Sequence, residues 1–118
     1  MSGIAAYKEL SVVTQDRGRI VVLLYEGAIK NIKLAIEAMT TGDYAKKGMY
    51  VTKALDIIFE LNCSLDVESG GEIAQNLRKL YSFMTRHLNM ASLKKDTQMM
   101  NDVIKVLEEL MSGWKAIA

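Results

Sequence analysis

Apolar residues recur along this chain at the three- and four-residue spacing of one face of an α-helix, and not in the alternation typical of a β-strand. Residues 20–25 depart from this spacing, because six apolar side chains follow one another there. The chain contains no proline, and its glycines fall at a few places, so little interrupts long helices. The pattern predicts an all-α protein.

Four long helices with short breaks between them are expected. Their expected bounds are 16–40, 43–68, from 71 or 72 to 93, and from 97 to close to the C-terminus. Asp16 and Asp96 can each cap the free amide groups of a first helical turn. The pair Thr41-Gly42 and the triplet Ser69-Gly70-Gly71 are typical helix stops. Each helix has roughly 22 to 26 residues, or about 35 Å at 1.5 Å per residue.

The short breaks determine the expected topology. Connections of about two to four residues force successive helices to run antiparallel. Residues 16–118 are therefore expected to form an antiparallel up-down four-helix bundle. Residues 1–15 lack sustained periodicity but hold several apolar side chains, so a short N-terminal arm resting on the bundle is expected.

Three of the expected helices carry more apolar surface than a bundle needs. A bundle helix buries a stripe a little over about 100° wide, whereas the apolar arc is about 200° on the second helix and about 160° on the first and fourth. The third is narrow, with Phe83 and Met90 set apart from its stripe. Contiguous exposed apolar patches usually mark interaction sites. The arcs alone leave two interpretations open, a partner surface or a wide core with covered edges.

Composition excludes several classes of partner. The chain has 15 basic and 14 acidic residues and a net charge of +1, so neither nucleic acid nor an anionic membrane is an expected partner. The longest apolar run, six residues, is far below the ~18 expected of a membrane-spanning helix. A single cysteine cannot form an internal disulfide and no secretory leader opens the chain, so a cytoplasmic location is expected.

Candidate chemistry is sparse. His87 is the only histidine and Cys63 the only cysteine, so neither metal-ligand spacing nor an activated thiol occurs. The acidic segment 65–72 lacks the ligand rhythm of a calcium-binding EF-hand, and its glycines do not form a phosphate loop. The sequence therefore predicts a protein that is not an enzyme and has neither a metal site nor a cofactor.

One motif carries a family resemblance. The run Leu-Tyr-Glu-Gly-Ala-Ile of residues 24–29 lies within SVVTQDRGRIVVLLYEGAIKNIKLA, residues 11–35. This segment resembles the opening of the flagellar export chaperone FliS family. The resemblance continues through residues 54–61, 65–66, 70–74, 80–81 and 114–115. Asp16-Arg17 stands where the family has Ser-Pro, which keeps a capping side chain and loses the proline suited to a first helical position.

The resemblance implies a cytoplasmic chaperone that is not an enzyme and forms an antiparallel helical bundle. Such a chaperone binds the disordered C-terminal segment of flagellin, prevents its premature polymerisation and helps deliver it to the type III export gate. A co-chaperone or regulator is a further partner of this kind of protein. The alternative function is a homodimeric structural or adaptor bundle without an unfolded client.

The resemblance also directs attention to residues for client binding. The family's N-terminal segment is thought to cover apolar surface that the client uses, so Tyr7 and Leu10 are expected to form a displaceable lid. The client surface itself is expected on the surplus edges of three helices, at Val22, Tyr25, Ile29, Ile57, Leu61, Met99, Val103, Val106 and Leu110. For each of these a place in the core is the alternative. Gly27, inside a helix, is expected to permit close approach of a neighbouring element.

Overall fold

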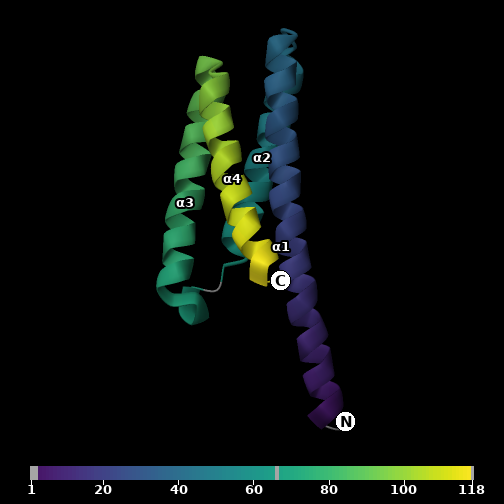
Figure 1. Cartoon of the computed structure of the whole chain (residues 1–118). Coiled ribbons are helices and arrows are strands. Elements are labelled where there is room, and N and C mark those ends of the chain that lie inside the picture. Colours follow the sequence, from purple (N-terminus) through teal and green to yellow (C-terminus); the bar gives the residue numbers. More distant parts are fainter. Residues whose placement is uncertain (1–2, 66, 118) are drawn as a thin grey trace.

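Four helices follow one another in the computed structural model of the chain, and no strand occurs among the described residues (Figure 1). The structure describes the backbone of residues 3–65 and 67–117 and the side chains of residues 18–65 and 70–116. The helices are α1 (Gly3–Thr40), α2 (Tyr44–Cys63), α3 (Val67–Lys94) and α4 (Thr97–Ile117). The all-α prediction is confirmed.

The helices form an antiparallel bundle. Helix α1 packs against α2 and α4, and α3 packs against the same two helices, so α1 and α3 occupy diagonal positions. Figure 1 shows the turns after α1 and α3 at the same end of the bundle. The up-down four-helix architecture therefore agrees with the prediction from short connections.

Helix α1 begins far earlier than expected. Its backbone is helical from Gly3, so the expected start at Asp16 is wrong. No proline lies between Gly3 and Asp16, so no residue there breaks the helix. In Figure 1 the N-terminal part of α1 continues the helix axis beyond the ends of the other helices. The assignment of residues 1–15 as a separate arm stays a prediction.

The turn after α1 is built by Gly42, which belongs to the predicted helix stop, and by Asp43. Gly42 has a positive φ of 77°, and its N–H donates to the carbonyl of Met39 at 3.1 Å. The N–H of Asp43 donates to the carbonyl of Ala38 at 2.8 Å, which completes a Schellman motif. The carboxylate of Asp43 then accepts from the N–H of Lys46 at 3.1 Å and caps α2.

The turn after α3 repeats this construction without glycine. Lys95 has a φ of 55°, and its N–H donates to the carbonyl of Ser92 at 3.3 Å. The N–H of Asp96 donates to the carbonyl of Ala91 at 2.9 Å. The carboxylate of Asp96 accepts from the N–H of Met99 at 3.1 Å, which confirms the predicted cap of α4.

Side chains join these two turns. The ammonium of Lys95 lies 4.1 Å from the centre of the Tyr44 ring, a cation–π distance. The ammonium of Lys47 donates to the carbonyl and to the hydroxyl of Ser92, at 3.2 and 3.0 Å. The start of α2 is therefore attached to the end of α3 at this end of the bundle.

The end of α2 and the start of α3 differ from the prediction. Helix α2 ends at Cys63 and not near residue 68, and the hydroxyl of Ser64 donates to the carbonyl of Leu61 at 2.7 Å. This side-chain bond competes with continuation of the helix. Gly71, with φ 56° and ψ −130°, breaks α3 after its first turn. The glycines thus interrupt the third helix instead of ending the second, and its main segment, 72–94, starts where expected.

A single apolar core joins all four helices. Its largest fully buried side chains are Tyr25, Ile32, Ile58, Leu61, Tyr81, Met84, Leu88, Met100, Val103 and Leu107. At the contact of α1 with α2, a β-carbon added to Gly27 would lie 3.3 Å from Cδ1 of Ile57. The expected close approach at Gly27 is therefore confirmed, and the neighbour is a helix of the same bundle.

Two tyrosines form a hydrogen bond across the diagonal of the bundle. The hydroxyl groups of Tyr25 on α1 and Tyr81 on α3 are bonded to each other, and both rings are buried. Burial raises the pKa of Tyr25 above its ordinary value, although its hydrogen bond with Tyr81 opposes this. Burial, followed by the hydrogen bond with Tyr25, raises the pKa of Tyr81. The folded protein thus holds both phenols in their neutral form.

The tyrosine pair predicts a loss of stability in alkaline solution. An unfolded tyrosine releases its proton near pH ~10, whereas the folded pair retains both protons. We therefore expect the free energy of unfolding to decrease above about pH 10, by up to ~1.4 kcal/mol per pH unit for each tyrosine. Urea unfolding at a series of pH values measures this slope. The Tyr25→Phe/Tyr81→Phe variant should show a shallower slope, and an unchanged slope would contradict the assignment.

Candidate functional site

Helix α3 carries two apolar stripes. One faces the core and consists of Ala74, Tyr81, Met84, Leu88 and Ala91. The other lies on the surface and consists of Ile73, Leu80, Phe83 and Met90, whose exposed fractions are 73, 36, 42 and 42%. The spacing of this second stripe is seven, three and seven residues, the average spacing of a seam that receives another helix. The outer stripe therefore has the geometry of a helix-binding surface.

A contact between His87 and Asp102 shows how α4 lies beside this stripe. Nε2 of His87 lies 3.2 Å from Oδ2 of Asp102 on α4. The ring of Phe83 is stacked on that of His87, with ring centres 5.0 Å apart. Because the two helices are antiparallel, one turn toward the start of α3 corresponds to one turn toward the end of α4. This register sets Phe83 opposite Val106.

The same register extends the surface in both directions. About one turn toward the end of α3 from His87, Met90 lies opposite Met99 of α4. In the other direction, beyond Phe83, Leu80 lies opposite Leu110. We call this surface the α3–α4 face. It consists of Leu80, Phe83, His87 and Met90 on α3 and Met99, Asp102, Val106 and Leu110 on α4. Apolar side chains thus surround a single polar pair.

The α3–α4 face can bind an apolar partner with useful energy. Its three exposed α3 side chains keep between a third and a half of their surface in water, and Met99, Val106 and Leu110 are half-buried. Covering such a side chain contributes on the order of 1 kcal/mol, because full burial contributes about 1.5–3 kcal/mol. Covering all six side chains would therefore contribute several kcal/mol to the free energy of binding a helical partner.

Five residues of the expected client surface are accessible in the structure. Met99, Val106 and Leu110 lie on the α3–α4 face. Val22 on α1 and Ile57 on α2 are also half-buried, and Ile57 lies at the close contact with Gly27. The structure therefore brings together only the three residues from α4.

Four other residues of the expected client surface belong to the core. Tyr25 and Val103 have no exposed surface, and Leu61 and Ile29 are 1 and 7% exposed. Tyr25, Leu61 and Val103 leave a partner almost no surface to cover while the helices keep this arrangement, whereas Ile29 also lines the hollow between α1 and α4 described below. For these positions the core alternative applies. The side chains of Tyr7 and Leu10 lie outside the described residues, so their role as a lid stays a prediction.

Three strongly exposed apolar residues were not assigned to the expected client surface. Phe59 on α2 is 68% exposed, and Leu23 and Ile20 on α1 are 59 and 53% exposed. Phe83 was separated from the core stripe of its helix but was not assigned to a surface. The seven-residue spacing on α3 is the signal that could have identified the outer stripe.

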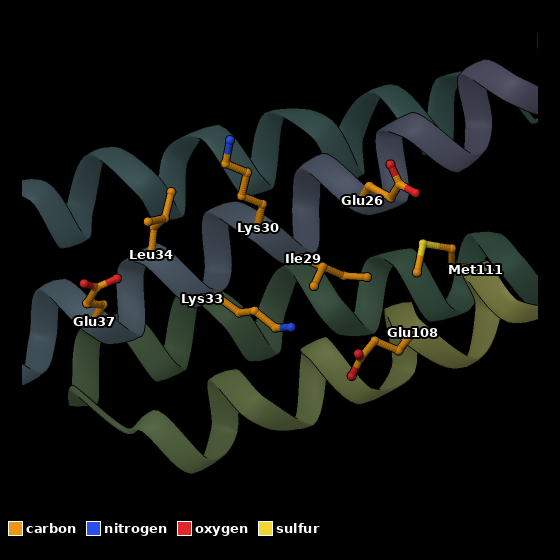
Figure 2. A pocket seen from close by; sticks show the side chains of 8 residues that line it. All are labelled: Glu26, Ile29, Lys30, Lys33, Leu34, Glu37, Glu108 and Met111. Atoms are coloured by element: carbon orange, nitrogen blue, oxygen red, sulfur yellow. The ribbon is translucent and has the colours of Figure 1, made fainter.

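A hollow with a volume of about 380 Å³ lies between α1 and α4 (Figure 2). Ile29, Leu34 and Met111 supply its apolar side chains, and Glu26, Lys30, Lys33, Glu37 and Glu108 supply charged ones (Figure 2). Charges of both signs alternate around it, and Lys115 lies 3.7 Å from Glu26 at one end. Because these charges can compensate one another, the hollow favours neither an acidic, a basic nor an apolar partner, whereas the α3–α4 face favours an apolar one.

Neither a metal centre nor a membrane span is found in the described part of the chain. No group of three or more His, Cys, Asp or Glu side chains there could hold a metal ion. None of the four helices, over the residues described, is long and apolar enough to cross a membrane. The α3–α4 face is accordingly the candidate functional site.

Comparison with known proteins identifies similar chains. The family described as Flagellar protein FliS matches residues 1–118. The flagellar secretion chaperone FliS of Vibrio cholerae serotype O1 is 41% identical over 116 residues, which cover 95% of this chain and 85% of the relative. The Salmonella typhimurium chaperone of the same name is 36% identical over 122 residues, 99% of this chain and 90% of the relative. The Bacillus subtilis one is 34% identical over 110 residues, 93% of this chain and 81% of the relative.

Proposed function

Because this chain belongs to the FliS family, whose members compared above are flagellar secretion chaperones, we propose that it binds the disordered C-terminal segment of flagellin. The α3–α4 face is the proposed binding surface. The observation that carries this assignment is the outer stripe of α3, which repeats at the spacing of a helix-binding seam.

The proposed interaction is coupled folding and binding. A disordered segment that becomes helical on the α3–α4 face places an apolar side chain on it about every third or fourth residue. Ordering the segment costs conformational entropy, which keeps the affinity moderate for a given contact area. A chaperone must release its client before secretion, so a moderate affinity suits this role.

Covering the C-terminal segment supports a protective function. Flagellin with this segment bound is expected not to polymerise in the cytoplasm, and the complex is expected to reach the type III export gate intact. The proposal requires neither a catalytic residue nor a cofactor. A co-chaperone or regulator would contact the protein elsewhere or compete for the face. The names of the relatives favour this function over a homodimeric scaffold without a client.

Calorimetry with a synthetic flagellin C-terminal peptide tests the proposed function. We expect a complex of about one to one with a negative change in heat capacity, because apolar surface is buried. A peptide of the same composition in scrambled order is the control and should give little heat. No heat with the native peptide, together with a tight dimer in analytical ultracentrifugation, would support the homodimeric alternative.

A further inference from the structure

A groove of about 360 Å³ lies on the other side of α3, between α3 and α2. It is lined by Leu55, Ile58, Phe59 and Asn62 of α2 and by Tyr81, Ser82, Thr85 and Arg86 of α3. Tyr81 belongs to the core and the remaining side chains take no part in the α3–α4 face. The groove is therefore a separate surface whose chemistry can be considered independently.

One wall of this α2–α3 groove is apolar. Ile58 is fully buried at its base, and Leu55 is half-buried beside it. Phe59 stands above them with 68% of its surface exposed, the largest exposed fraction of any aromatic side chain in the described part of the chain. An exposed phenylalanine beside a hollow offers an aliphatic or aromatic side chain a contact on two sides.

Each wall also holds one polar group without a partner among the described residues, Asn62 on α2 and Arg86 on α3. Arg86 is the one charged residue lining the groove, and within the described residues it forms no ion pair. The side-chain oxygen of Asn62 is buried and has no hydrogen-bond partner there. Thr85, by contrast, donates to the carbonyl of Tyr81 at 2.9 Å and is satisfied. The guanidinium of Arg86 is therefore available to a ligand, whereas the buried oxygen of Asn62 reaches one only after its amide rotates.

We propose that the α2–α3 groove binds a short acidic segment of a second partner protein. The segment places an apolar side chain against Phe59 and a carboxylate on the guanidinium of Arg86, which can hold a carboxylate through two parallel hydrogen bonds. Rotation of the Asn62 amide, which has a broad torsional range, presents its oxygen to a main-chain N–H of the segment. This partner is recognised by its acidic and apolar side chains together.

The charges of the two surfaces indicate two different ligands. On the α3–α4 face Oδ2 of Asp102 already lies 3.2 Å from Nε2 of His87, and apolar side chains surround this pair, so an apolar helix needs no charged group. In the groove the charge of Arg86 is uncompensated among the described residues, so an acidic group is favoured. That flagellin and the acidic segment bind at the same time rests on the proposed function. Binding of the acidic segment in the groove does not.

A designed peptide pair provides the test. The probe is a synthetic, end-capped 12-residue peptide with Leu at every third or fourth position and Glu beside each Leu, and its control carries Gln in place of Glu. We expect the acidic peptide to bind the full chain about two- to fivefold more tightly than the neutral one, as expected of one ion pair at a surface. Nuclear magnetic resonance shifts should be largest at Phe59, Asn62 and Arg86.

Two variants decide the role of the guanidinium. Arg86→Gln should bring the ratio of the two affinities close to one, whereas Arg78→Gln, a matched change outside the groove on the same helix, should leave it unchanged. Phe59→Ala should weaken both peptides alike. Equal effects of Arg86→Gln and Arg78→Gln, or shifts centred on the α3–α4 face, would overturn the proposal.

A competition experiment separates this proposal from the proposed function. Saturation with the flagellin peptide should leave the affinity of the acidic peptide unchanged within about twofold. Displacement of the acidic peptide would show that the two surfaces are not independent and would overturn the inference of a second partner. If the flagellin peptide does not bind at all, the proposed function fails, and the results with Arg86→Gln still decide the groove.

Discussion

Replacing Phe83 by glutamate is expected to weaken binding of the flagellin C-terminal peptide at least about 30-fold, or ~2 kcal/mol. Phe83 lies near the centre of the α3–α4 face and is 42% exposed in the free protein. A bound helix would remove the new carboxylate from water beside Asp102, and burial of a charge without a partner of opposite charge is costly. Calorimetry measures the affinity, and far-UV circular dichroism should show unchanged helix content because the position is at the surface.

Ser82→Glu provides the matched control for this substitution. Ser82 is the preceding residue, it is exposed, and it lies on the α2 side of α3, so the variant has the same added charge away from the face. Val106→Glu and Leu110→Glu probe the same face from α4. If Phe83→Glu and Ser82→Glu bind the peptide equally well, the α3–α4 face is not the binding surface. If the α4 variants lose their helicity, those two positions belong to the core.

The second large effect concerns the diagonal tyrosine pair. Tyr25→Phe is expected to lower the free energy of unfolding by about 1–3 kcal/mol, because it leaves the hydroxyl of Tyr81 in the core without its partner. Tyr81→Phe should have a similar effect. Urea unfolding followed by circular dichroism measures both losses. Tyr44→Phe is the control, since Tyr44 is exposed and its ring remains available to Lys95.

The double variant distinguishes a hydrogen bond from simple loss of packing. When both hydroxyls are absent, no unsatisfied group remains, so Tyr25→Phe/Tyr81→Phe should lose less than the sum of the single variants. We expect the difference to be on the order of 1 kcal/mol. Strictly additive losses would show that the two hydroxyls contribute independently.

Local signals in the sequence were sufficient for two of the three turns. Asp96 caps α4 as expected, and Asp43, the expected first residue of the second helix, caps α2, because an aspartate after a helix stop can satisfy free amide groups. Gly42 ends α1 because its positive φ is easily adopted by glycine. Such features depend on neighbours along the chain, so they could be predicted without knowledge of the packing.

The end of α2 and the start of α1 were harder to predict, because no strong helix-stopping or helix-starting residue decides between helix and other local conformations there. Helix α2 ends at Cys63, followed by a serine that bonds to the preceding turn, although residues 64–68 hold no glycine or proline. The start of α1 was missed for the opposite reason, since an aspartate can cap a helix or lie within one. At both places several local conformations are similar in energy, and the sequence pattern alone cannot rank them.

The expected client surface stays a prediction, and the burial of its residues could be predicted only in part. Within the wide apolar arc of α4, Val103 is buried while Val106 is half-buried. Which edge of an arc faces a neighbouring helix depends on the lateral placement of that helix, and this is a property of the whole bundle. Tyr25 and Leu61 were assigned to the surface for the same reason, although they are buried.

The attachment of α2 to α3 through Lys95, Tyr44, Lys47 and Ser92 gives the molecule a preferred direction of opening. Both tight turns lie at one end of the bundle (Figure 1), and their cross-links make this end the expected hinge. At the far end, where α3 is broken at Gly71, the described residues provide no comparable link. If the helices separate to admit a client, the separation is therefore expected to be largest at this far end, where α3 would move outward most near Ile73.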